Sequence, residues 1–171
     1  AHQNAVYRGV SFLLREQEAN GAWFGRWGTN YIYGTWSVLE AMQLAKQDMK
    51  HTAVRRAVQW LKSVQREDGG WGESNDSYLD PKLAELETST AFQTAWALLG
   101  LMAAGEVKSE SVRRGINYLL SAQSSNHLWE EPWFTAPGFP RVFYLRYHGY
   151  SKFFPIWALA RYRRLTRENV A

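Results

Sequence analysis

Cysteine is missing from all 171 residues of the chain. Its absence excludes disulfides, thiolate zinc ligands and cysteine nucleophiles. A long apolar run is missing as well, because the longest, Ala95 to Ala104, is about half of the roughly 20 residues that span a bilayer. We expect that run to form a buried helix. The four histidines show no ligand spacing, so we expect no metal site.

The sequence also lacks the clustered positive charge that is typical of nucleic-acid binding. The net charge is +4, but the 20 Lys and Arg residues are spread along the whole chain, so we expect no nucleic-acid partner. Their one concentration is near the C-terminus and consists of Arg161, Arg163, Arg164 and Arg167. Two interpretations fit this group: a solvated helix C-terminus, where the dipole favours cations, or contact with anionic lipid headgroups.

Aromatic residues are abundant, at 15% of the chain with nine Trp, which is more than a core of this size requires. The apolar residues follow helical rather than alternating spacing, which predicts an all-α fold without strands. The length suits one domain or a slice of a larger one. Thr52 is the expected cap of the third helix, and a polar loop is expected from 72 to 86. The expected helices cover about 4–17, 33–46, 52–65, 88–104, 109–123 and 151–167.

A frame consisting of Gln followed by Trp six residues later occurs three times. Each copy is preceded by Arg-Gly or Arg-Ala and by an aromatic residue five positions before the Gln. A Trp also recurs on the helix after each copy, at Trp36, Trp96 and Trp157. Such a repeat predicts stacked or closed helix pairs in which charged and apolar helices alternate. The three copies are Gln17 with Trp23, Gln65 with Trp71, and Gln123 with Trp129.

The residue types of this frame suit a structural role between neighbouring helices. A Gln amide at a helix end can bond the free N–H groups of a neighbouring helix start or the last carbonyls of its own helix. The Trp ring can then cover the amide from water. We therefore interpret the frame as a fastener between helix pairs, whose loss would lower stability rather than alter chemistry.

The frame resembles the QW motif of squalene-hopene and oxidosqualene cyclases. The first two copies fit it fully, and the third differs by having His127 where the motif has Gly. Residues 23–36 are similar to the segment that follows a QW turn in this family. Another similar segment, the C-terminal signature, comprises Gly138-Phe139-Pro140, Phe143-Tyr144-Leu145, Tyr147 and Tyr150. The resemblance covers the whole chain, but only the C-terminal part of a cyclase.

The resemblance implies an α/α toroid of alternating inner and outer helices, in which residues 1–171 form part of an incomplete barrel. It also implies a squalene-hopene type cyclase, an isomerase or lyase of hopanoid and triterpenoid biosynthesis in bacteria, which cyclises a squalene-like polyprene without a cofactor. The family's acidic Asp-x-Asp-Asp motif is absent here. We therefore expect a fragment that is inactive alone, with apolar inner helices exposed at its broken edges, and whose partner is the upstream half of the same polypeptide.

The expected location is the cytoplasmic side of a membrane, as a peripheral or monotopic protein that contacts the membrane surface. The alternative function is a non-catalytic helical-repeat module that binds an apolar ligand or a protein partner. Its motivation is the missing acidic motif.

Cyclisation through carbocations requires groups that are electron-rich but not nucleophilic, and aromatic faces meet that requirement. The resemblance assigns Tyr33 a catalytic role, near the acidic motif and able to hydrogen-bond it. Phe139, Phe143 and Tyr147 are spaced by four and would share a helical face if their segment forms a helix, although this spacing also fits an ordinary packing stripe. By resemblance, the cavity-lining residues are Trp27, Phe139, Phe143, Tyr147 and Tyr150.

Overall fold

The computed structural model describes residues 2–135 and 137–168. Six α-helices lie close to the six expected positions, each end shifted by less than one turn, which confirms the helical fold class. The helices are α1 His2–Arg15, α2 Tyr31–Leu44, α3 Thr52–Ser63, α4 Ala91–Ala103, α5 Glu110–Ser121 and α6 Tyr150–Glu168. The expected buried helix is α4.

The expectation of no strands is wrong. Two antiparallel pairs occur, one joining Trp71 to Thr90 and the other joining Phe139 to Phe143. Three of these four strands have only two or three residues, too short for an alternating pattern to be visible in the sequence, and the pairing depends on segments that meet only after folding. They are β1 Trp71–Glu73, β2 Glu85–Thr90, β3 Pro137–Phe139 and β4 Phe143–Tyr144, with the short 3₁₀ helices η1 Asn75–Tyr78 and η2 Pro81–Leu83 between β1 and β2.

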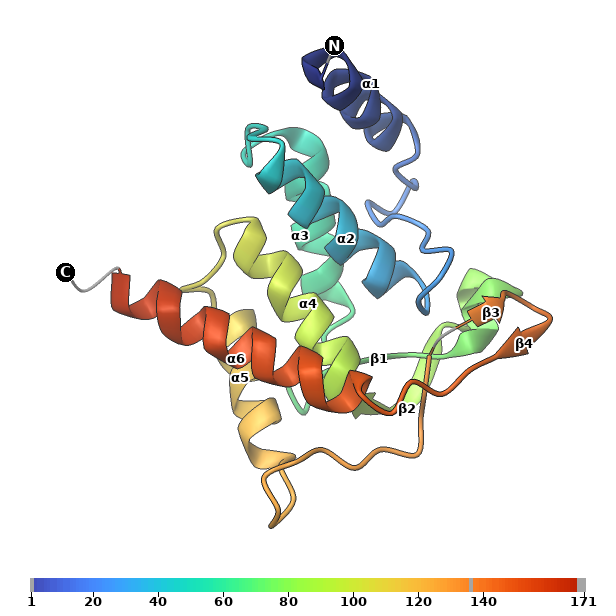
Figure 1. Ribbon diagram of the computed structural model, residues 1–171, viewed down its shortest axis with the longest axis vertical. Helices are drawn as coiled ribbons and strands as arrows, with labels where there is room; N and C mark the ends of the chain where they lie inside the picture. The colour runs from blue at the N-terminus through green and yellow to red at the C-terminus, as the bar shows by residue number, and fades with distance from the viewer. Residues whose placement is uncertain (1, 136, 169–171) are drawn as a thin grey trace.

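Helix α4 is the centre of the core. All 13 of its residues are buried, because α2, α6 and α5 pack around it. Figure 1 shows α2, α4 and α6 side by side as a layer, with α3 and α5 behind this layer. Helices α3 and α5 bury only one face each, as expected of outer helices. The arrangement is that of a helical toroid, and the described residues form an open arc of it.

Two local expectations need correction. The cap of α3 is His51 rather than Thr52, because the His51 imidazole nitrogen accepts the Ala53 N–H at 3.2 Å. Arg161 is not solvated: its guanidinium pairs with the Glu40 carboxylate, and its side chain is only 11% exposed. This pair links α6 to α2.

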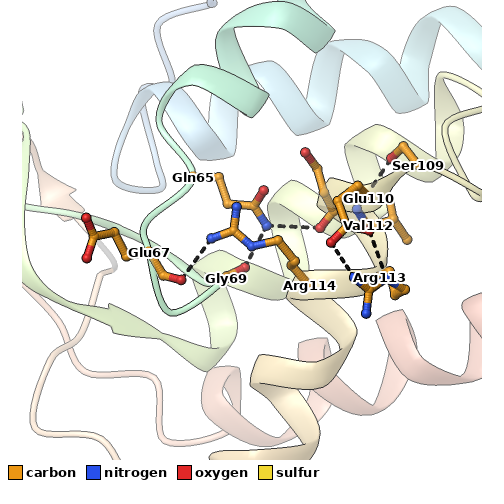
Figure 2. Close-up of polar contacts among 9 residues, drawn as sticks. Gln65, Glu67, Gly69, Ser109, Glu110, Val112, Arg113 and Arg114 are labelled. Carbon is orange, nitrogen blue, oxygen red and sulfur yellow. Dashed lines mark hydrogen bonds and ion pairs between the residues drawn. The ribbon is translucent and has the colours of Figure 1, made fainter.

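The second Gln-to-Trp turn joins α3 to α5. Gln65 donates its amide hydrogens to the carbonyls of Gly69 (2.8 Å) and Ser111 (2.9 Å), the latter in the first turn of α5 (Figure 2). The Trp71 indole N–H donates to the Leu61 carbonyl near the end of α3 (2.8 Å). The partners of the Gln65 amide therefore differ from those expected: they are a carbonyl in the turn and a carbonyl in the neighbouring helix, rather than the free N–H groups of that helix or the last carbonyls of α3.

Candidate functional site

An aromatic cluster surrounds Trp96 in the middle of α4, where its side chain is fully buried. Trp36 of α2 stacks on it with ring centroids 5.8 Å apart, and Tyr33 meets it edge to face at 5.1 Å. From α6, Tyr150 and Phe154 approach it at 5.9 and 5.3 Å. The inner helices α2, α4 and α6 thus bring their aromatic rings together around Trp96. Sequence reasoning used Trp36 and Trp96 only as markers of the repeat.

A second aromatic group lies at the loop before α2 and on the β3–β4 pair. Trp27 contacts Phe139 at 6.2 Å, and Phe139 contacts Phe143 at 5.7 Å, both edge to face. These three side chains are between 45% and 58% exposed. The segment does not form the helix on which a shared helical face depended, since Phe139 and Phe143 pair across two strands. Gly138 permits this packing, because a Cβ there would lie 1.9 Å from the Phe143 ring.

The two aromatic groups meet at Tyr33. Its ring packs directly on Gly28, the neighbour of Trp27, where a Cβ would lie only 2.4 Å from the ring. On the other side, Tyr150 lies 5.1 Å from Tyr147. Burial, together with nearby Tyr33 and Tyr147, raises the pKa of Tyr150 above its usual value. The six side chains named by resemblance thus fall into two aromatic groups, which approach each other where the Tyr33 ring packs on Gly28. Their part in a reaction stays a prediction.

A buried carboxylate fixes the start of α2. Glu73, which is 6% exposed, accepts the backbone N–H groups of Asn30 (3.1 Å), Tyr31 (3.0 Å) and Ile32 (3.0 Å). Burial raises the pKa of Glu73, and the three N–H donors oppose that rise because they favour the charged form. The contact holds the helix turn that carries Tyr33.

Tyr78 fixes the loop that carries Trp27. Its hydroxyl lies 3.0 Å from the Gly25 carbonyl and 2.7 Å from the Gly28 carbonyl, and shares its proton between them. Burial raises the pKa of Tyr78 well above its usual value, so the hydroxyl remains a donor. Its own carbonyl accepts from Arg141 at 2.6 Å, which ties the β3–β4 turn to the same place.

Glu131 occupies the corresponding position at the start of α4. Its carboxylate accepts the Ala91 N–H, and its backbone carbonyl accepts from the Arg146 guanidinium. Burial raises the pKa of Glu131 to about 7, against the opposing effects of backbone N–H groups and Arg146. It lines a cavity of about 420 Å³ together with Tyr147 and Tyr150.

Sequence reasoning missed Glu73, Glu131 and Tyr78. A signal for the two carboxylates was present, since each follows the Trp of a Gln-to-Trp turn by two residues. No comparable signal marks Tyr78. A further cavity of about 650 Å³ lies beside the second turn, and none of the six side chains named by resemblance lines it.

The described residues contain no group of three side chains suited to hold a metal ion. None of their helices combines the length and apolarity needed to cross a bilayer.

Comparison with known proteins gives a consistent result. Residues 1–164 match the family model of the squalene-hopene cyclase C-terminal domain. The chain is 62% identical over 167 residues to a probable squalene-hopene cyclase of Sinorhizobium fredii, covering 97% of this chain and 26% of that protein. It is 61% identical over 161 residues to a squalene-hopene cyclase of Zymomonas mobilis, covering 94% and 24% respectively. The chain thus spans about a quarter of the length of these relatives.

Among solved structures, a protein from Actinoplanes aligns with a TM-score of 0.54 and 23% identity, covering 81% of this chain and 38% of that one. This likeness concerns the fold alone.

Proposed function

Because the chain belongs to the squalene-hopene cyclase family, whose C-terminal domain it matches over residues 1–164, we propose that it forms part of the wall of a cavity in which a linear polyprene is cyclised through carbocations. The complete polypeptide would be an isomerase-type enzyme of this family. The supporting observation is that two aromatic groups lie next to each other, one with Trp27 and one with Tyr33 and Tyr150, linked by the contact of the Tyr33 ring with Gly28. The partly exposed rings of this aromatic zone offer a face that the rest of the polypeptide could close over.

The aromatic zone suits this chemistry. A desolvated cation over a Trp, Tyr or Phe ring gains about 0.5 to 2 kcal/mol, and a single carbocation passing several rings can draw on more than one of them. Phe139 and Phe143 expose about half of their surface, and neither ring is a nucleophile that would trap the cation. The cations formed late in a cyclisation would be the ones to meet Tyr147 and Tyr150, if the substrate lies with its far end toward α6.

Tyr33 has a separate proposed role. Its ring is held edge to face by Trp36 (5.7 Å) and by Trp96 (5.1 Å), so the position of its hydroxyl is fixed by packing. We propose that this hydroxyl hydrogen-bonds the acid that starts the reaction, supplied by the upstream part of the polypeptide. Tyr33→Phe would then lower the turnover of the full-length enzyme and leave its product pattern unchanged.

The cavity proposal is tested in the full-length polypeptide with squalene as substrate. Phe143→Ala and Trp27→Ala are expected to lower kcat or to release incompletely cyclised products. Phe12→Ala is the matched control: the residue is 51% exposed, against 45% for Phe143, and it lies on α1, outside both aromatic groups.

Unchanged rate and products in both variants would refute the cavity role of these rings. An inactive wild-type polypeptide whose upstream part carries no acidic motif would instead favour the non-catalytic apolar-ligand module.

We also propose peripheral attachment to the cytoplasmic side of a membrane, because the substrate class is lipid-soluble. Exposed Arg163 and Arg167 near the end of α6 would contact anionic headgroups. Flotation of the full-length protein with anionic liposomes tests this. A protein that stays in the soluble fraction contradicts the attachment to membranes. A protein that floats equally well after both arginines are changed to Gln contradicts their contact with the headgroups.

A further inference from the structure

Gln93 is a buried polar residue in the first turn of α4, with only 1% of its surface exposed. It precedes Trp96 by three residues. The same position before Trp36 and Trp157 holds the aromatic residues Tyr33 and Phe154. A buried amide destabilises the folded protein unless its polar atoms are hydrogen-bonded. An amide at a position where the other two inner helices have rings is therefore explained by the bonds it makes.

The Gln93 amide uses both of its ends. Its oxygen accepts the Glu73 N–H and the Thr90 hydroxyl, each at 2.9 Å. Its nitrogen donates to the Glu73 carbonyl at 2.9 Å and, over a longer distance of 3.4 Å, to the Thr29 carbonyl. One side chain thus pairs both backbone groups of Glu73, as a neighbouring antiparallel strand does. These bonds fix the backbone of Glu73 relative to α4.

Glu73 carries this restraint on to α2. Its carboxylate accepts three successive backbone N–H groups, those of residues 30 to 32, at 3.0 to 3.1 Å. Tyr33 is the next residue along the chain. A continuous path of hydrogen bonds therefore runs from Gln93 through Glu73 to the turn of α2 that carries Tyr33.

Helix α4 holds Tyr33 in two ways. Its Trp96 ring meets the Tyr33 ring edge to face at 5.1 Å, which holds the side chain. Its Gln93 holds, through Glu73, the backbone from which that side chain extends. Bonds from N–H groups to a carboxylate are short and directional, so they define the orientation of a helix start closely. The position of the Tyr33 hydroxyl depends on both restraints.

We propose that Gln93 is a positioning residue for the reaction: by fixing Glu73, it sets the first turn of α2 and hence the place of the Tyr33 hydroxyl. Gln93 itself touches no reacting atom. The inference rests on the proposed role of Tyr33 beside the starting acid. Since a misplacement of about 1 Å can cost about 100-fold in rate, loss of the Gln93 amide is expected to lower kcat by about 10- to 100-fold. The KM for squalene is expected to change little, because the exposed rings that would meet the substrate remain.

The kinetic test uses the full-length polypeptide with squalene, below the Tm of every variant. Gln93→Leu removes all four bonds and keeps an apolar side chain of similar size in their place. Gln65→Leu is the matched control, because the same substitution removes an amide that joins the second turn to α5 rather than to α2. Both variants are expected to lower Tm, and only Gln93→Leu to lower kcat.

A milder variant keeps the test decisive if Gln93→Leu does not fold. Gln93→Glu retains the shape and the accepting oxygen, and a buried carboxyl holds its proton and so keeps one donor. Its kcat is expected to lie below that of wild type, and above that of Gln93→Leu where both fold. A wild-type kcat in a folded Gln93 variant overturns the inference if Tyr33→Phe lowers turnover in the same assay.

Hydrogen exchange tests the positioning without the reaction. In Gln93→Leu, the N–H groups of residues 30 to 32 are expected to exchange faster than in wild type, whereas in Gln65→Leu they exchange at the wild-type rate. Unchanged exchange in Gln93→Leu overturns the inference. Tyr33→Phe separates the two proposals: if this variant keeps full turnover, the proposed role of Tyr33 fails and the kinetic role of Gln93 fails with it. A loss of turnover in Tyr33→Phe without one in Gln93→Leu overturns the role of Gln93 alone.

Discussion

Replacement of Glu131 by Gln is expected to flatten the pH dependence of unfolding. Burial raises the pKa of the Glu131 carboxyl from 4.5 to about 7. Between these values the folded protein retains a proton that the unfolded chain has released. Stability therefore falls as pH rises through this window, and the loss is complete above about pH 7.

The size of the effect follows from the same difference. A pKa rise from 4.5 to about 7 corresponds to about 3 kcal/mol of unfolding free energy, lost progressively across the window. The Gln side chain keeps the oxygen that accepts the Ala91 N–H but does not titrate. Tyr118 lies near the same carboxyl, and burial raises the pKa of its hydroxyl, so this phenol stays protonated from pH 5 to 8 and adds nothing to the difference between wild type and variant.

Urea unfolding of the full-length polypeptide at intervals from pH 5 to 8 measures the effect. Glu110→Gln is the control, because the Arg113 partner lowers the pKa of Glu110 and keeps its titration below this range. The variant Glu131→Gln should gain stability over wild type with rising pH, while the control stays parallel to wild type. Parallel curves for Glu131→Gln, or a gain toward low pH, would refute the reasoning.

Three further predictions concern the contacts around the turns, all in the full-length polypeptide. Gln65→Ala should cost about 1–3 kcal/mol through its bonds to Gly69 and Ser111, with products unchanged; altered products at normal stability would contradict a fastening role. Tyr78→Phe should lower kcat by loosening the loop of Trp27, and a normal pattern of rates and products would count against it. Gly69→Ala, at φ +90°, should destabilise more than the same change at Gly9, where a Cβ meets nothing, as thermal melts would show.

The helices could be predicted from the sequence because helical spacing is local. Helix α4 is apolar all round and is buried all round, so its place in the centre follows from its composition. The strands could not be predicted, since β1 has three residues and pairs with a segment beyond two 3₁₀ turns. The cap at His51 was missed because imidazole is an uncommon capping acceptor beside a Thr.

The residues of the candidate site were likewise predicted only in part. Resemblance named six aromatic side chains, and the structure places them in two adjacent groups. It could not supply Tyr78, which reaches the Gly28 carbonyl across 50 positions of sequence, nor Glu73, which reaches the start of α2 across more than 40. The spacing of four between Phe139 and Phe143 was compatible with a helical face but also arises across a strand turn, and the pairing of β3 with β4 decides for the turn.

The sequence by itself determined the all-α class, the three Gln-to-Trp turns and the family, because these depend on residue order and spacing along one chain. Tertiary structure decided which partners the turns hold, where the carboxylates of Glu73 and Glu131 lie, and which rings face one another. Those contacts join residues far apart in sequence, and their energy depends on burial and distance, which exist only once the helices have packed.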